Sequence, residues 1–165
     1  MNHAVLLTVL AIAACFDWRQ RKVPNALTLP AMAVGLWYQY QTGTAWTAWG
    51  GLGGAFLLTF GPVACKGMGM GDQKLLMAVG AWSSWTVVFS LFLYAILLCV
   101  LTTFFVPRTW SRLRANLLTL ATGWKAHREM WLPEREQSAY SLPFGVFLLA
   151  AYGILHFQSA AGSIV

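Results

Sequence analysis

The sequence predicts an all-α, polytopic membrane protein with six transmembrane helices and an amphipathic helix on the cytoplasmic membrane surface. Hydrophobic residues make up 58% of the chain and charged residues only 10%, whereas soluble domains carry about 25% charged residues. The apolar residues also gather in runs, and a run of about 20 residues can cross a bilayer as a helix. We therefore expect a single transmembrane domain over residues 1–165.

The first apolar run covers Ala4–Phe16, which is short for a membrane span. A signal peptide is the alternative, and residues 12–15 resemble a lipoprotein cleavage site. However, no Lys or Arg precedes the run, and a basic cluster follows it, which is the reverse of a signal peptide. We therefore expect a retained helix whose N-terminus lies outside the cytoplasm.

Residues 17–25 follow the first run and contain three basic side chains, which mark a cytoplasmic loop. Pro24 ends any helix that runs into it, and Asn25 is a favourable helix N-cap. The second span is therefore expected over residues 26–38. The segment 39–47 is polar, uncharged and flanked by aromatic residues, as expected of a loop at the outer interface.

A third span is expected over residues 50–64, where glycines would let membrane helices approach closely. Residues 66–74 carry three glycines at alternate positions, which favours a backbone with positive φ and close packing. The fourth span then begins at residue 75 and ends before a turn at Ser83 and Ser84. The fifth and sixth spans are expected over residues 87–106 and 142–157.

The long polar segment 107–141 holds six of the eleven Lys and Arg residues. Five of its apolar residues fall on one helical face: Leu113, Leu117, Leu120, Trp124 and Trp131. This pattern predicts a helix that lies on the membrane surface. When the six spans are threaded from an outer N-terminus, all basic residues lie on the cytoplasmic side or at its helix ends. That placement explains the net charge of +6 without nucleic acid as a partner.

Two aspartates stand at cytoplasmic helix ends, since Asp17 follows the first span and Asp72 precedes the fourth. An acidic side chain at the depth of the membrane costs free energy, so its presence there suggests that it has a function. Two carboxylates held close together share one proton, because like charges cannot both ionise. An aspartic protease uses this state to activate water and to polarise the scissile carbonyl. Taken singly, Asp17 is also explained as a loop acid beside Arg19 and Arg21, and Asp72 as a helix N-cap.

No other pattern in the sequence competes with this pair of acids. Cys15, Cys65 and Cys99 are dispersed and form no CxxC, which argues against a disulfide framework and a zinc site. The glycine stretch lacks the GxxxxGK[ST] pattern of a phosphate-binding loop. We therefore expect neither a metal nor a cofactor.

Two stretches of sequence are more specific than any single residue. They are Asp17-x-Arg19-x-x-Lys22-Val23-Pro24-Asn25 and Gly69-x-Gly71-Asp72-x-Lys74-Leu75. Together they resemble the two signature stretches of the type IV prepilin peptidases, which are membrane aspartic proteases of the GxGD class. The resemblance extends over the whole chain, including six spans and the late stretch 143–145.

The resemblance implies that Asp17 and Asp72 are the catalytic pair. It also implies a set of supporting residues, namely Arg19, Lys22, Pro24, Asn25, Gly69, Gly71, Lys74, Pro143 and Gly145. The implied activity is removal of the basic leader peptide from a type IV prepilin or pseudopilin at the cytoplasmic face of the inner membrane. The implied partners are that substrate, the lipid bilayer and, as a further candidate, the pilus assembly machinery.

One departure from the larger members of the family bears on the substrate. Those members carry a cytoplasmic domain with paired CxxC motifs for zinc, and they also N-methylate the new N-terminus. This chain has no CxxC and starts directly at the first span, so we expect no zinc or methyltransferase domain before it. It therefore resembles the short, protease-only branch that serves Flp-type pili, to which the archaeal preflagellin peptidases are similar.

Two other functions fit part of the pattern. A proton- or ion-coupled transport subunit would use Asp17 and Asp72 as relay carboxylates, but it predicts acids near the bilayer midplane instead of at helix ends. An inactive pilus-assembly subunit would bind pilin without cleaving it, and it would not need both acids intact. Cleavage of a synthetic prepilin by the purified protein separates these functions from a peptidase.

Overall fold

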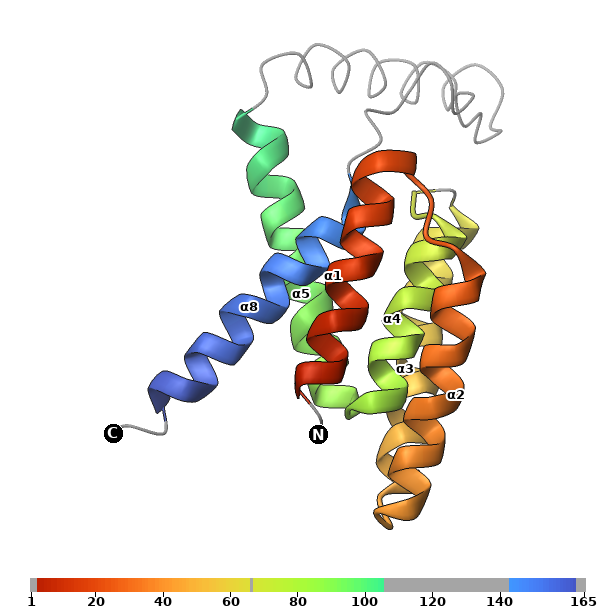
Figure 1. The fold of residues 1–165 in the computed structure, drawn as a ribbon. Helices are drawn as coiled ribbons and strands as arrows, with labels where there is room; N and C mark the ends of the chain where they lie inside the picture. Colours follow the sequence, from red (N-terminus) through yellow and green to blue (C-terminus); the bar gives the residue numbers. More distant parts are fainter. Residues whose placement is uncertain (1–2, 66, 106–142, 163–165) are drawn as a thin grey trace. The chain divides into compact units, whose positions relative to one another are not determined.

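The computed structural model describes residues 3–65, 67–105 and 143–162, and each regular element in these residues is a helix (Figure 1). The helices are α1 His3–Gln20, α2 Asn25–Gln41, α3 Ala45–Ala64, α4 Met70–Trp82, α5 Trp85–Phe105 and α8 Phe144–Gly162. The chain divides into two compact units, residues 1–98 with 143–165 and residues 99–142. The predicted surface helix lies outside the described residues.

The described helices confirm the all-α prediction, although several begin and end at other residues than expected. Helix α1 continues through Asp17 to Gln20, so Asp17 belongs to its last turn and not to a loop. Helix α4 begins at Met70, inside the glycine stretch, and therefore includes Asp72 in its first turn. By length and composition, residues 85–103 of α5 can cross a membrane, and the number of six transmembrane helices stays a prediction.

The prediction that Asn25 caps a helix is wrong. Pro24 holds the N-cap position of α2 in an extended conformation, and the helix has no side-chain cap. The carbonyl of Pro24 accepts the backbone N–H groups of Leu27 and Thr28. The side chain of Asn25 is therefore left to bond elsewhere.

Positive φ in the glycine stretch is also not observed. Among the described residues, positive φ occurs only at Arg21 and Gly43. Gly69 has a φ of −74° and holds the N-cap position of α4. Gly69 instead lies where a side chain would crowd the Asp72 carboxylate, and Gly71 lies at ordinary contact distance from Val23, so both serve close packing.

Helix α4 forms the centre of the first unit, where it packs against α2 and α3 and also contacts α1 and α8 (Figure 1). Eight of its 13 residues are buried, and Leu75, Leu76 and Val79 have no exposed surface. Because α4 carries Asp72, this packing fixes one half of the candidate site.

Glycines allow the close contact between α3 and α4. A Cβ built at Gly51 or Gly80 would overlap the backbone of the other residue. At the same end of α4, the indole Nε1 of Trp82 donates to the carbonyl oxygen of Ala31 at 2.8 Å, which ties α4 to α2. The first contact depends on small residues that let two helices approach closely, and the second is a hydrogen bond between helices that satisfies a buried indole.

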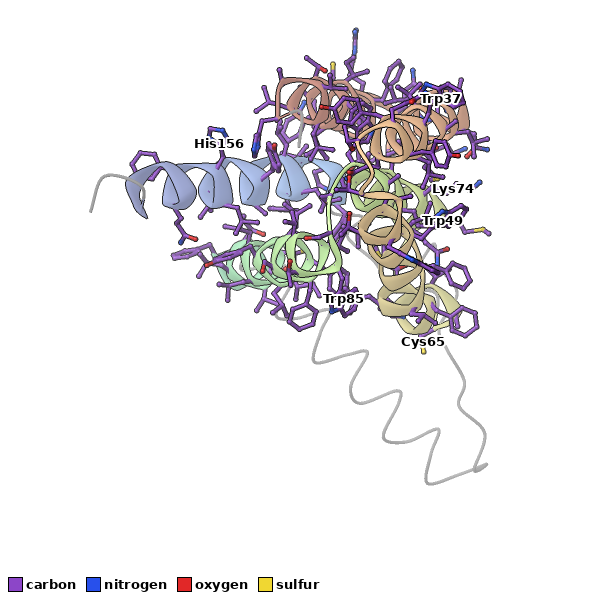
Figure 2. All side chains as sticks on the ribbon, turned by 90° about the horizontal axis from the view of Figure 1, so that it is seen from below. Trp37, Trp49, Cys65, Lys74, Trp85 and His156 are labelled. Carbon is purple, nitrogen blue, oxygen red and sulfur yellow. The ribbon has the colours of Figure 1, made fainter. Side chains whose placement is uncertain are left out.

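Large apolar side chains are exposed on each of the described helices. Trp37 and Trp85 lie at the outer edge of the helices in Figure 2, with 66% and 42% of their surfaces exposed. On other faces, Leu57 and Phe157 are 74% and 75% exposed. Such extensive apolar exposure is typical of a surface that contacts a membrane or a partner.

Candidate active site

Asp17 is a buried carboxylate in the last turn of α1, with 5% of its surface exposed. The backbone N–H of Gly145, in the first turn of α8, donates to Asp17 Oδ2 at 2.7 Å. Arg21, one turn further along the chain, contributes a positive charge that favours the ionised carboxylate. The site therefore joins the end of α1 to the start of α8.

Asp72 occupies the first turn of α4, three residues after the N-cap Gly69. An acidic side chain at this position can reach back to the N–H of the cap residue, and the backbone of Gly69 hydrogen-bonds the Asp72 carboxylate. A Cβ built at Gly69 would lie 3.1 Å from Asp72 Oδ2. Glycine at this position therefore leaves room for the carboxylate.

The two carboxylates affect each other's protonation, and both lie outside the apolar runs expected to cross the membrane. Burial raises the pKa of Asp17 above its ordinary value, while the Gly145 N–H and the charge of Arg21 oppose that rise. Burial, followed by the negative charge of Asp17, raises the pKa of Asp72 to about 7. The pair therefore favours an ionised Asp17 beside a protonated Asp72 near neutral pH.

Two further contacts hold the signature stretches together. A Cβ built at Gly71 would lie 3.5 Å from the backbone nitrogen and the Cβ of Val23, so the segment before α2 lies against the first turn of α4. Lys74 Nζ donates to Asn25 Oδ1 at 2.9 Å, and Figure 2 shows Lys74 at the edge of the helices. These contacts bring both stretches to one end of the first unit.

The other predicted supporting residues have more peripheral places. Arg19 and Lys22 are exposed and make no contact with the pair among the described residues. Pro24 starts α2, as described above. Pro143 precedes α8, and its carbonyl accepts the N–H of Val146 at 3.1 Å.

Two groups act on Asp17 in ways that the sequence did not predict, namely the charge of Arg21 and the backbone N–H of Gly145. Arg21 has a detectable signal, because a charge four residues after an acid lies on the same face of a helix. The backbone N–H of Gly145 has no such signal, since 128 positions separate it from Asp17. Gly145 was expected as a supporting residue only through the family resemblance.

The best-formed cavities of the described part of the chain lie elsewhere. One has a volume of about 470 Å³ and is lined by Tyr38, Trp82 and neighbouring polar residues at the other end of α2 and α4. The second, of about 390 Å³, lies between α2 and α3. Neither is lined by Asp17 or Asp72.

Comparison with known proteins gives one family and one curated relative. The model of the type IV leader peptidase family matches residues 4–104, which include both aspartates. A prepilin leader peptidase/N-methyltransferase of Escherichia coli K12 is 36% identical over an alignment of 78 residues, which covers 42% of this chain and 35% of that protein. The match thus spans about a third of the relative's length. No solved structure matches the chain.

Proposed function

Because the chain belongs to the type IV leader peptidase family, we propose that it is an aspartic endopeptidase that removes the basic leader peptide of a type IV prepilin. The observation that carries this proposal is the meeting of Asp17 and Asp72 from two separate stretches of sequence. Burial, together with the negative charge of Asp17, raises the pKa of Asp72 to about 7. A pair of carboxylates that shares one proton at neutral pH is suited to acid–base hydrolysis.

In the proposed reaction the two carboxylates have different roles. The ionised Asp17 takes a proton from a water molecule as that water attacks the carbonyl carbon of the scissile peptide bond. The protonated Asp72 donates a hydrogen bond to the carbonyl oxygen and stabilises the negative charge that develops there. Breakdown of the tetrahedral intermediate needs a proton on the leaving nitrogen, and the pair returns that proton.

The surface of the protein supports a substrate with an apolar helix. A prepilin consists of a short basic leader followed by such a helix, and its helix can lie in the bilayer beside the exposed apolar faces. The bond to be cut would then reach the pair at the helix ends. We propose an Flp-type prepilin as the substrate, because the sequence resembles the short branch of the family.

The proposed setting is the inner membrane, with several spans and the aspartate pair on the cytoplasmic side. The family is one of membrane proteins, and α5 is long and apolar enough to cross a bilayer. The distribution of basic residues supports a cytoplasmic location for the end of α1 and the start of α4. An N-terminus outside the cytoplasm follows from the same threading.

The direct test is cleavage of a synthetic prepilin by the purified protein in detergent, followed on a gel. Asp17→Asn and Asp72→Asn should each reduce cleavage by about 10³-fold or more, because an amide cannot exchange the proton that the reaction needs. The double variant should be no worse than either single variant, since the two acids act as one unit. Thermal unfolding should show that all three variants remain folded.

Glu129→Gln is a suitable control, because it makes a comparable acid-to-amide change in the polar segment 107–141, outside both signature stretches. It should retain most of the activity. Near-normal turnover by Asp17→Asn or Asp72→Asn would exclude an aspartic peptidase mechanism. Absence of cleavage by the wild-type protein would instead favour the relay-carboxylate transporter or the pilin-binding subunit.

A further inference from the structure

The contact between Gly145 and Asp17 is specific to glycine. Gly145 is buried, and its backbone N–H lies 2.7 Å from Asp17 Oδ2. A Cβ built at position 145 would lie 3.1 Å from Oδ2 and 3.2 Å from the Cβ of Asp17. These separations are too short for a comfortable contact, so any larger residue would push the carboxylate away from the amide.

The donor N–H belongs to the first turn of a helix, so the hydrogen bond favours one charge state of the Asp17 carboxyl group. The first N–H groups of a helix have no partner within the helix. They also lie at the positive end of the helix dipole, which favours a negative charge. The first turn of α8 therefore binds the ionised form of Asp17 better than the neutral form.

The charged groups around Asp17 favour the same state. Arg21, directly after the end of α1, is positive, and Arg19 in the last turn of α1 is exposed. On α4 the charged groups are Asp72, the partner acid, and Lys74, which is bonded to Asn25 of α2. The ionisable side chains of α2, Tyr38 and Tyr40, lie toward its far end, and those described on α8, Tyr152 and His156, follow Gly145 by seven and eleven residues.

Asp72 receives its hydrogen bond differently. Its backbone partner, Gly69, belongs to the same helix turn, so that bond forms with α4 itself. The bond at Asp17 depends on a second helix that is distant in the sequence. The position of α8 therefore acts on Asp17 directly, and on Asp72 through the charge of Asp17.

We infer that Gly145 is a positioning residue for the proposed reaction, whose backbone N–H at the start of α8 makes Asp17 the ionised member of the pair and leaves the proton on Asp72. This inference rests on the proposed peptidase function. It assigns the roles within the pair, and it makes the correct placement of α8 a condition for cleavage. Oδ2 of Asp17 is held by the amide, so Oδ1 is the oxygen that takes the proton from water.

The test compares Gly145→Ala with Gly153→Ala in the full-length protein. Both glycines lie in α8, but a Cβ at Gly153 would meet nothing within 4 Å. Gly145→Ala should lower kcat by about tenfold or more with little change in KM. It should also move the acidic limb of the pH profile upward by about one to two units, the scale of one hydrogen bond to a carboxylate. Gly153→Ala should leave kcat and the pH profile unchanged.

A purely structural role for Gly145 predicts a different result. Activity would then fall by the same factor at every pH, with both limbs in place, and that outcome would overturn the inference. A wild-type protein that does not cleave prepilin at any pH would instead refute the proposed function. The two failures are therefore distinguishable.

A second measurement does not depend on the folding of a variant at position 145. The wild-type protein, labelled with ¹³C at the aspartate carboxyl groups, is titrated by NMR, and the two signals are assigned with Asp17→Asn and Asp72→Asn. Asp17 should lose its proton at the lower pH. Ionisation of Asp72 before Asp17 would contradict the assignment of roles.

Discussion

Asp72 links the proposed chemistry to the stability of the fold. The pKa of its carboxyl group is about 7 in the folded chain, against an ordinary value of 3.8. The folded state therefore binds this proton more tightly than the unfolded state. The resulting stabilisation is fully present below pH 3.8, and it is lost as the pH rises through about 7.

Replacement of Asp72 by Asn should therefore stabilise the protein at pH 8 and have little effect at pH 4. The expected gain at pH 8 is on the order of 2 kcal/mol, because the amide avoids the cost of a buried charge beside Asp17. Thermal unfolding in detergent at both pH values measures it. An equal gain at pH 4 and pH 8 would show that the titration of Asp72 is not the cause.

At the same scale, the sequence predicted that Asp17 and Asp72 interact, but not what surrounds them. Asp17 and Asp72 could be found because each stands at one end of an apolar run, where an ionisable side chain is costly and therefore suggests a function. The role of Asn25 was predicted wrongly, because Pro24 takes the capping position. The hydrogen bond from the Gly145 amide could not be predicted from the sequence, since a backbone N–H can donate at almost any residue type. Only the packing of α8 brings this N–H to Asp17.

At the scale of helices, the crossing of α3 and α4 holds one half of the pair in place. Gly51 and Gly80 let the two backbones approach closely. Asp72 is carried by α4, so a shift at this crossing would displace it from Asp17. The crossing lies away from the site, and its effect on activity would therefore be indirect.

Gly51→Ala should destabilise the protein by about 1–3 kcal/mol, because the new methyl group overlaps the backbone of α4 and forces the helices apart. Gly53→Ala is the matched control on the same helix, since a Cβ there meets nothing within 4 Å. It should be neutral or stabilise by up to about 1 kcal/mol through the better helix propensity of alanine. Thermal unfolding of both variants measures the difference, and equal effects would contradict the described contact.

The existence of the helices could be predicted from the apolar runs, whereas their ends were harder to place. Helix α4 starts earlier than its apolar run, because Gly69 and Asp72 form a local hydrogen-bonded start. Helix α1 ends later than its run, where Arg21 adopts a φ of 54°. The hydrophobicity of a sequence indicates which part of a helix is buried or contacts lipid. It does not indicate the first and last turns, because these turns are polar.

At the scale of the whole molecule, the proposed orientation places the turn between α2 and α3 on the outer side of the membrane. It places the segment between α3 and α4 on the cytoplasmic side. Both segments offer positions for a chemical test. Gln41 is exposed at the end of α2, and Cys65 is exposed directly after α3.

In intact cells, a membrane-impermeant maleimide should label Gln41→Cys in a background without other cysteines. It should not label a variant that retains only Cys65 until the cells are opened. This result is expected because the basic residues gather on the side of Cys65. Labelling of Cys65 in intact cells would reverse the proposed orientation and place the aspartate pair on the outer side.

The shortness of α4 has a consequence for the supply of water to the reaction. Its 13 residues span about 20 Å at a rise of 1.5 Å per residue, whereas the hydrocarbon core of a bilayer is about 30 Å thick. In the proposed membrane setting, a central helix of this length produces hydrophobic mismatch, which thins the bilayer locally. Asp72 at its start would then lie in a hydrated depression below the level of the lipid head groups. A hydrolytic site could in this way obtain water without a channel through the protein.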